Sequence, residues 1–328
     1  LVGHDVLVPG NAMKLEGGKA AGGFTLASAA EKVVVTITDA AGTTTVDTAN
    51  ILAADIELRD SVLLGVDTTI AGTNSVAFGS TLSSQSGKGN DLTLNSPDAT
   101  FSGVVGGNAG GALGLVTTDA AGTTTISKAF TAASAVFNDS VKIGESAATG
   151  AVTVTTTGDQ TYNGAVTLAQ DTTIETHTVT FGLSLDSALS DRALTVNTNG
   201  SGITVFNGPV GAINPLLSLT TNADGFTSIA GGVINTSGDQ EFNDAVVLGL
   251  TTILSGNDIT FKEIVDSDTI ARDLTINSSG NGITTFEKAV GGLRQLGSLT
   301  TNSDGTLHLN GGTVKAEGDV SFGETTQL

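Results

Sequence analysis

Four tight turns in this sequence carry the oxygen atoms best suited to binding a metal ion. Each turn has an Asp or Asn followed three residues later by Gly: Asp39 to Gly42, Asp119 to Gly122, Asn222 to Gly225 with Asp224 between them, and Asn302 to Gly305 with Asp304 between them. Hard cations such as calcium prefer oxygen ligands, which makes Asp39, Asp119, Asp224 and Asp304 candidate calcium ligands. The sequence contains neither an EF-hand loop nor a Gly-Gly-x-Gly-x-Asp nonapeptide. An Asx turn in which Gly takes a positive φ explains the pattern more simply, so we expect no cofactor, with calcium as the alternative.

A second set of residues resembles the carboxylate–arginine clusters of glycan-cleaving enzymes. Asp186, Asp191 and Arg192 lie close together in the sequence, and a matching set, Asp266, Ala271 and Arg272, occurs further along the chain. A catalytic set is needed only once, whereas a residue that recurs with a repeat is more simply structural. The three histidines, His4, His177 and His308, have no His or Cys at metal-ligand spacing. We therefore expect no catalytic residues and no enzymatic activity.

The repeat that weakens these candidates extends over most of the chain. Residues 218–222 (SLTTN) recur at 298–302, residues 158–160 (GDQ) at 238–240, and residues 39–45 (DAAGTTT) at 119–125, each with an offset of 80. Between the matching segments, short runs of alternating apolar and polar residues are separated by turns rich in Gly, Asn and Asp. This pattern predicts a repeat protein made of short strands.

The spacing of aromatic residues favours a parallel β-helix over an antiparallel sandwich. Phe181, Phe206, Phe242, Phe261, Phe286 and Phe322 are separated by 25, 36, 19, 25 and 36 residues. If each gap of 36 holds two coils, a repeat contains about four coils of 18 to 25 residues, and residues 37–328 form about 14 coils at roughly 20 residues each. Residues 137–141 (FNDSV) and 162–166 (YNGAV) resemble each other at a distance of 25, which predicts one inserted coil.

Two further residue types suggest stacking between coils. Asn95, Asn197 and Asn277 each end a Leu-Thr-aliphatic strand, so we expect them to form a structural ladder at a corner of the helix. Triple threonines at 43–45, 123–125 and 155–157 raise ice binding as an alternative. Because the coils differ in length, the β-propensity of Thr on an exposed face is the preferred explanation.

Composition excludes several classes of function. The 328-residue chain has a net charge of −20 with 13 Lys and Arg, which disfavours binding to nucleic acids or anionic membranes. No apolar run is long enough for a membrane helix. Cysteine is absent, so disulfides do not stabilise the fold. We interpret the chain as part of a longer protein.

The beginning of the chain resembles the start of the globular part of bacterial flagellar hook-capping proteins. The resemblance is carried by residues 1–10 (LVGHDVLVPG), 23–26 (GFTL) and 32–42 (KVVVTITDAAG). It implies a hook-cap-related scaffold as one possible function. We assign residues 1–36 to an N-terminal β cap or hook-cap-like segment.

The remainder, residues 37–328, resembles the repeat regions of large secreted bacterial adhesins of the filamentous-haemagglutinin and autotransporter kind. The shared features are the Leu-Thr-Thr-Asp/Asn…Gly-Thr-Thr and Gly-Asp-Gln-x-Tyr/Phe-Asn blocks. We divide this solenoid at about 37–116, 117–219, 220–299 and 300–328. The resemblance implies a structural or adhesive shaft on the outer surface of a bacterium, with glycans or proteins of a host or neighbouring cell, or copies of itself, as partners. A self-assembling extracellular filament is an alternative function, and so is a polysaccharide-binding or polysaccharide-cleaving β-helix.

Overall fold

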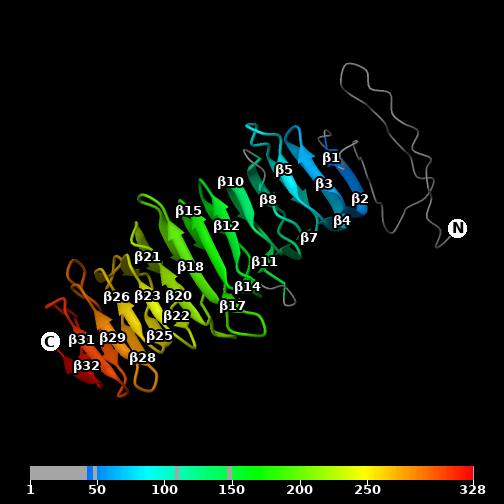
Figure 1. Ribbon diagram of the computed structural model, residues 1–328. Coiled ribbons are helices and arrows are strands. Elements are labelled where there is room, and N and C mark those ends of the chain that lie inside the picture. The colour runs from blue at the N-terminus through cyan, green and yellow to red at the C-terminus, as the bar shows by residue number, and fades with distance from the viewer. Residues whose placement is uncertain (1–42, 47–49, 108–110, 146–149, 328) are drawn as a thin grey trace, which may run out of the picture. The chain divides into compact units, whose positions relative to one another are not determined.

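The described part of the protein is built entirely from β-strands and the turns between them. The structure is a computed structural model that describes residues 43–46, 50–107, 111–145 and 150–327. Within these residues there is no helix, and the strands pair in parallel to form a β-solenoid of about 12 turns over residues 55–327 (Figure 1). The predicted all-β parallel β-helix is therefore confirmed. The N-terminal segment 1–36 and the hook-cap resemblance over 1–42 lie outside the described residues.

Each turn of the solenoid contributes one strand to each of three parallel ladders, or an isolated bridge in place of a strand at Val105, Val210, Val290 and Val314. Strands β2 (Asn50–Leu58), β4 (Thr68–Phe78) and β10 (Phe130–Phe137) are long enough to bend round a corner and pair in two ladders. Ladder 1 contains the first part of β10 together with β1 (Thr43–Val46), β3 (Ser61–Leu64), β5 (Leu82–Ser84), β12 (Val152–Thr156), β15 (Thr172–Thr176), β18 (Ala193–Thr198), β20 (Ser218–Thr221), β23 (Gln240–Phe242), β26 (Ile259–Phe261), β29 (Ile283–Phe286), β31 (Thr306–Leu309) and β33 (Thr325–Gln327).

The remaining two ladders follow the same order along the chain. Ladder 2 contains the first parts of β2 and β4, the second part of β10, and β6 (Leu92–Asn95), β8 (Leu113–Thr118), β13 (Gln160–Tyr162), β16 (Val179–Phe181), β19 (Ile203–Phe206), β21 (Phe226–Ile229), β24 (Ala245–Leu248) and β27 (Val265–Ser267). Ladder 3 contains the second parts of β2 and β4, and β7 (Asp98–Phe101), β9 (Thr123–Ile126), β11 (Ser140–Ile143), β14 (Val166–Leu168), β17 (Leu185–Ser187), β22 (Val233–Asn235), β25 (Thr252–Gly256), β28 (Leu274–Ser278), β30 (Leu299–Thr301) and β32 (Val320–Phe322).

Alternation of side chains decides which residues form the core. In β12 the residues are alternately buried and half-buried, so Val152 and Val154 point inward while Thr153 points outward. The turns differ in length, because Val141 pairs with Thr124 in the turn before it but with the more distant Val166 in the turn after it. The solenoid has about 12 turns over residues 55–327, whereas the sequence predicts about 14 over the longer range 37–328. Variation in length is confined to the connections, because the strands must keep their pairing.

The 80-residue repeat does not correspond to a whole number of turns. Phe206 in β19 and Phe286 in β29 are equivalent in sequence, yet β19 belongs to ladder 2 and β29 to ladder 1. Counting the bridge at Val210, eleven strand positions separate them, and with three positions per turn this is 3⅔ turns. The expected value of about four coils per repeat is thereby refined to 3⅔. Each repeat places its residues one ladder back from the previous copy.

The inserted coil predicted near Phe137 is present. Phe137 pairs directly with Tyr162 in the next turn, and the Nδ2 of Asn163 donates to the Oδ1 of Asn138 over 2.8 Å. From Thr117 in β8 to Leu219 in β20 there are fourteen strand positions, against eleven from Leu219 to Leu299. The difference of three positions is one complete turn.

Aromatic side chains form columns inside the solenoid, and the columns follow the change of ladder. Rings are stacked at 5.4 Å between Phe78 and Phe101 in ladder 3. In ladder 2 the column consists of Phe137, Tyr162, Phe181 and Phe206, with centroids 5.2–5.4 Å apart, and in ladder 1 of Phe242, Phe261 and Phe286, at 5.2 and 4.9 Å. The long sequence gap between Phe206 and Phe242 is thus 1⅔ turns, and it marks the passage from one column to the next.

One position in the aromatic columns leaves a buried polar atom without a partner. The hydroxyl of buried Tyr162 donates to the Oε1 of Gln160 over 2.8 Å, and burial raises the pKa of that hydroxyl above its usual range. In the next repeat, Gln240 holds the same place and its Nε2 donates to Ile234 and Ser255, as that of Gln160 does to Val154 and Glu175. Because Phe242 has no hydroxyl, the Oε1 of Gln240 has no hydrogen-bond partner.

Phe242→Tyr should therefore stabilise the protein. We expect the new hydroxyl to reach Gln240 and add about 1 kcal/mol to the free energy of unfolding, the usual net value of a hydrogen bond. The matched change Tyr162→Phe should lower that free energy by about 1–3 kcal/mol, because it leaves the Oε1 of Gln160 unsatisfied. Urea denaturation followed by circular dichroism measures both. Destabilisation by Phe242→Tyr would show that the two positions are not equivalent.

Candidate functional site

Buried carboxyl groups at the corners of the solenoid are its most unusual polar feature. Asp139 accepts hydrogen bonds from the hydroxyls of Thr118 at 2.6 Å and Thr124 at 2.7 Å. Asp244 does the same with Thr221 at 2.7 Å and Thr227 at 2.9 Å. In each case one threonine ends a strand of the preceding turn and the other is the second residue of the next strand, so the carboxyl group links two turns at a corner.

A related acid near the C-terminal end of the described chain reaches one turn further. The Oε1 of Glu324 accepts hydrogen bonds from Ser278 at 2.5 Å and Thr284 at 3.1 Å, which lie two turns before it. Asp244 and Glu324 occupy equivalent positions in successive repeats, whereas Gly164 holds that position one repeat earlier. These acids were not predicted as site residues from the sequence. The signal that could have found them is an acidic residue two positions after a buried aromatic, as in Phe137-Asn138-Asp139 and Phe242-Asn243-Asp244.

Burial changes the acidity of these groups. It raises the pKa of Asp244 to about 6, because the ionised form loses hydration that the two threonine hydroxyls only partly replace. The pKa of Asp139 is raised for the same reason. A buried acid with a raised pKa is sometimes catalytic. Here, however, each of these two acids is enclosed by hydroxyls of its own corner and is less than 3% exposed, so it has no access to a substrate.

Asp244 should make the stability of the protein depend on pH. Its pKa in the folded state lies above its ordinary value of 3.8, so the folded state favours the protonated form. The stabilising contribution is complete below about pH 4 and is lost as the pH rises towards 6, by about 3 kcal/mol for a shift of this size. We expect Asp244→Asn to remove this part of the pH dependence and to raise the melting temperature at pH 7.

Thermal unfolding between pH 4 and pH 8 measures this effect, with the exposed Asp224→Asn as the matched control. The control should follow the wild-type profile. Parallel profiles for the wild type and Asp244→Asn across this range would contradict the assignment of a raised pKa to Asp244.

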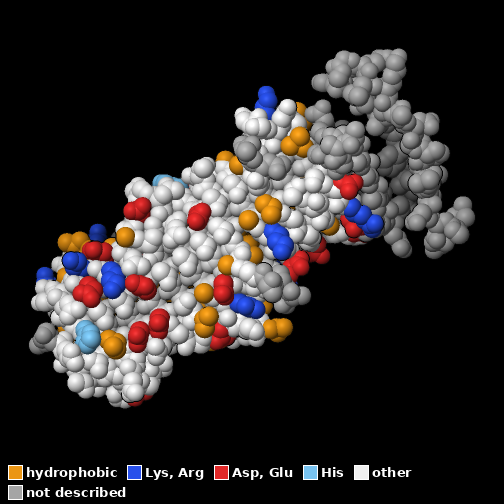
Figure 2. All heavy atoms as spheres, viewed as in Figure 1, with side chains coloured by type: hydrophobic (Ala, Val, Ile, Leu, Met, Phe, Trp, Pro, Cys, Tyr) orange, Lys and Arg blue, Asp and Glu red, His pale blue; other side chains and the backbone are white. Residues whose placement is uncertain are grey.

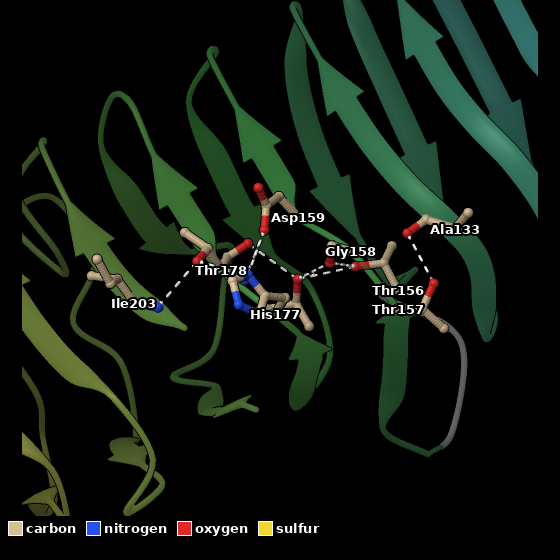
Figure 3. Close-up of polar contacts among 9 residues, drawn as sticks. Ala133, Thr156, Thr157, Gly158, Asp159, His177, Thr178 and Ile203 are labelled. Atoms are coloured by element: carbon tan, nitrogen blue, oxygen red, sulfur yellow. Dashed lines mark hydrogen bonds and ion pairs between the residues drawn. The ribbon is translucent and has the colours of Figure 1, made fainter. Parts of the chain in front are cut away.

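Exposed polar residues at another corner also link successive turns (Figure 3). Asp159 accepts the backbone N–H of Thr178 at 3.2 Å, and its Oδ1 lies 3.0 Å from the Nδ1 of His177. In the next repeat Asp239 accepts from the backbone of Asp258 at 3.2 Å and from the Nδ2 of Asn257 at 2.9 Å. An amide thus replaces the imidazole in the same contact. His177 therefore holds a corner, and its contact with Asp159 is not specific to histidine.

The candidate calcium ligands are far apart and lie in turns of the expected kind. Asp39 is outside the described residues, while Asp119, Asp224 and Asp304 follow strands of ladders 2, 1 and 3. Their turns end in Gly122, Gly225 and Gly305, with φ of +76°, +73° and +84°. A Cβ on Gly225 would lie 1.7 Å from the carbonyl oxygen of Gly202, so the turn needs Gly for space as well as for φ. Within the described residues, no group of three or more His, Asp or Glu side chains is arranged to hold a metal.

The expected asparagine ladder is not formed by the three residues proposed for it. Asn95 belongs to ladder 2 and pairs with Ala71, Asn197 belongs to ladder 1 and pairs with Glu175, and Asn277 belongs to ladder 3 and pairs with Ser255. They are separated because the repeat is not a whole number of turns. Axial amide contacts are made instead by asparagines of the corners: the Nδ2 atoms of Asn138, Asn222, Asn243 and Asn302 donate to carbonyls of the preceding turn.

The carboxylate–arginine sets support loops. Asp186 accepts the backbone N–H groups of Ile213 and Asn214, and Asp266 accepts those of Leu293 and Arg294. Asp186 therefore positions a loop of the next turn, and the structure gives it no hydrogen bond or ion pair with Arg192.

The arginines of the two sets differ. Arg272 forms two bonds of 2.9 Å with Asp268, which lowers the pKa of that carboxyl to about 2. Arg192 has Ala188 in the corresponding place, and its buried Nε has no hydrogen-bond partner. Asp268 was not predicted from the sequence as the partner of Arg272.

Comparison of the chain with protein-family models, curated proteins and solved structures gives no match. The assignment to the β-solenoid class therefore rests on the strand pairings described above. Among the described residues, none belongs to a helix that could cross a membrane.

Proposed function

We propose that this chain is the non-catalytic shaft of a large secreted protein on the outer surface of a bacterium. In this proposal the stacked turns hold many copies of a weakly binding surface at fixed spacing. Binding at several places along the shaft then gives an avidity that no single contact provides. Glycans or proteins on the surface of a host or neighbouring cell are the proposed partners.

The observation that carries this proposal is an outward column of side chains on ladder 1, most of which are threonines. The strand register aligns Thr153, Thr173, Thr195 and Thr220 in four successive turns, followed by Glu241 and Thr260. All of these side chains are half-exposed. Because paired strands are about 4.8 Å apart, the column presents hydroxyls at a regular spacing although the turns differ in length.

The hydrogen bonds of the repeated acidic residues support a non-catalytic role for the chain. Asp186 and Asp266 are occupied by backbone N–H groups of the next turn, while Asp139 and Asp244 are enclosed by threonine hydroxyls. A single column of threonines, interrupted by Glu241, also differs from the flat array of several columns that ice binding would require. The proposed bacterial surface location rests on the resemblance of residues 37–328 to adhesin repeats.

Removing hydroxyls from the column should weaken adhesion. We expect Thr195→Val with Thr220→Val to reduce several-fold the retention of protein-coated beads on epithelial cells. The contributions of simultaneous contacts multiply, so the loss of two contacts weakens the total avidity strongly. Val keeps the β-branched shape and strand preference of Thr. Bead retention under flow, counted by microscopy, measures the effect.

The matched control is Thr161→Val with Thr180→Val, an adjacent outward pair in ladder 2. It should leave bead retention unchanged. Equal losses in both variants would remove the special role of ladder 1. Wild-type beads that adhere no better than albumin-coated beads would contradict the adhesive function itself, and clumping of the beads with one another would favour self-assembly.

A further inference from the structure

Two loop clusters, one in each of two successive repeats, are built on the same hydrogen-bonded framework. In the first, the Oγ of Ser187 accepts the backbone N–H of Arg192 at 2.9 Å, and in the second Ser267 accepts that of Arg272 at 2.9 Å. The buried carboxyl groups of Asp186 and Asp266 hold the following loop through two backbone N–H groups each. Each framework carries an apolar tip, Ile213 at 78% and Leu293 at 81% exposure.

Residues that differ between the two repeats indicate function better than conserved repeat residues, which serve the shared framework. Eight residues of the second cluster differ in chemistry from their counterparts in the preceding repeat: Asp268 replaces Ala188, Thr269 replaces Leu189, Ile270 replaces Ser190, Ala271 replaces Asp191, Arg294 replaces Asn214, Gln295 replaces Pro215, Lys315 replaces Asn235 and Glu317 replaces Ser237. All eight line one groove of about 410 Å³, together with Leu293. The framework does not require them, since the first cluster forms without them.

The groove has an excess of available positive charge. Asp268 is paired with Arg272 through two bonds of 2.9 Å, so its charge is already compensated. Arg294 and Lys315 are exposed, and within the described chain neither forms an ion pair. Glu317 is the one acidic lining residue left to oppose them. Figure 2 shows side chains of both charges gathered over the C-terminal turns.

The chemistry of the lining selects a class of ligand. A guanidinium group binds a carboxylate with two parallel hydrogen bonds, and an ammonium group adds a second cation. Ile270, at 60% exposure, and Leu293 provide aliphatic contact beside these cations. No aromatic residue is among the large exposed hydrophobics of the described chain, so the stacking surface typical of saccharide sites is not offered. The chain's remaining carboxylates act weakly here, because interactions between exposed charges are screened beyond about 8 Å at physiological salt.

We propose that this groove binds an acidic, aliphatic peptide segment of a partner protein, with Arg294 and Lys315 holding its carboxylates and Ile270 and Leu293 contacting its apolar side chains. This interaction is separate from the hydroxyl column and does not depend on the proposed adhesive function. The cluster around Ile213 has the same framework with Asn214 and Asn235 in place of the two cations, so it provides an internal comparison.

A fluorescein-labelled peptide of alternating Leu and Glu tests the proposal by fluorescence anisotropy. We expect the wild type to bind it and to bind the matched Leu–Gln peptide at least about tenfold more weakly, the effect of losing roughly 1.4 kcal/mol. Arg294→Asn with Lys315→Asn should abolish the preference. These substitutions restore the residues of the preceding repeat, so the fold should tolerate them.

The converse variant, Ser190→Ile with Asn214→Arg and Asn235→Lys, introduces the two cations and the missing aliphatic side chain into the first cluster. It should add a second binding site for the acidic peptide. The proposal is overturned if both peptides bind equally, if the double Asn variant binds as well as the wild type, or if no binding is detected. Loss of self-association in the double Asn variant, seen by sedimentation without peptide binding, would assign the groove to a second copy of this chain and also overturn it.

Discussion

The parallel pairing of each strand with the same ladder in the next turn is the constraint on which the rest of this structure depends. Backbone hydrogen bonds fix the distance between turns at about 4.8 Å, so every inward side chain must fit directly onto the one before it. Flat rings satisfy this requirement, as the stacked Tyr162 and Phe181 at 5.2 Å show. At the corners, side chains such as Asp139 and Asp244 add hydrogen bonds between turns.

A repeat of 3⅔ turns gives the solenoid a property that a whole-turn repeat would lack. Equivalent residues of successive repeats lie on different ladders, so the aromatic column is in ladder 3 at Phe101, in ladder 2 at Phe181 and in ladder 1 at Phe261. A sequence motif is thereby presented in different directions around the axis. The two loop clusters with Ile213 and Leu293 follow the same rule, since their supporting strands belong to ladders 3 and 2.

Much of the fold could be predicted, because strand alternation and the 80-residue period are both visible in the sequence itself. The inserted turn was also visible, in the similarity of the segments at Phe137 and Tyr162. The asparagine ladder was not predictable in this way. Asn197 and Asn277 are equivalent in sequence, but the number of strands per turn is set by pairing between distant segments, and this places them in different ladders. The contacts of Asp244 with Thr221 and Thr227 were not predictable either, because they too join segments that are distant in the sequence.

The central claim, that the repeat spans 3⅔ turns, is tested most directly by distances between pairs of spin labels, because the chain has no cysteine of its own. Thr173 and Thr260 are four turns apart in one column, so nitroxides on Thr173→Cys and Thr260→Cys should be about 19 Å apart by electron double resonance. The repeat-equivalent pair, Thr180→Cys and Thr260→Cys, should give a clearly longer distance, because its members lie in different ladders. The reverse order, with the repeat-equivalent pair closer together than the pair in one column, would contradict the account.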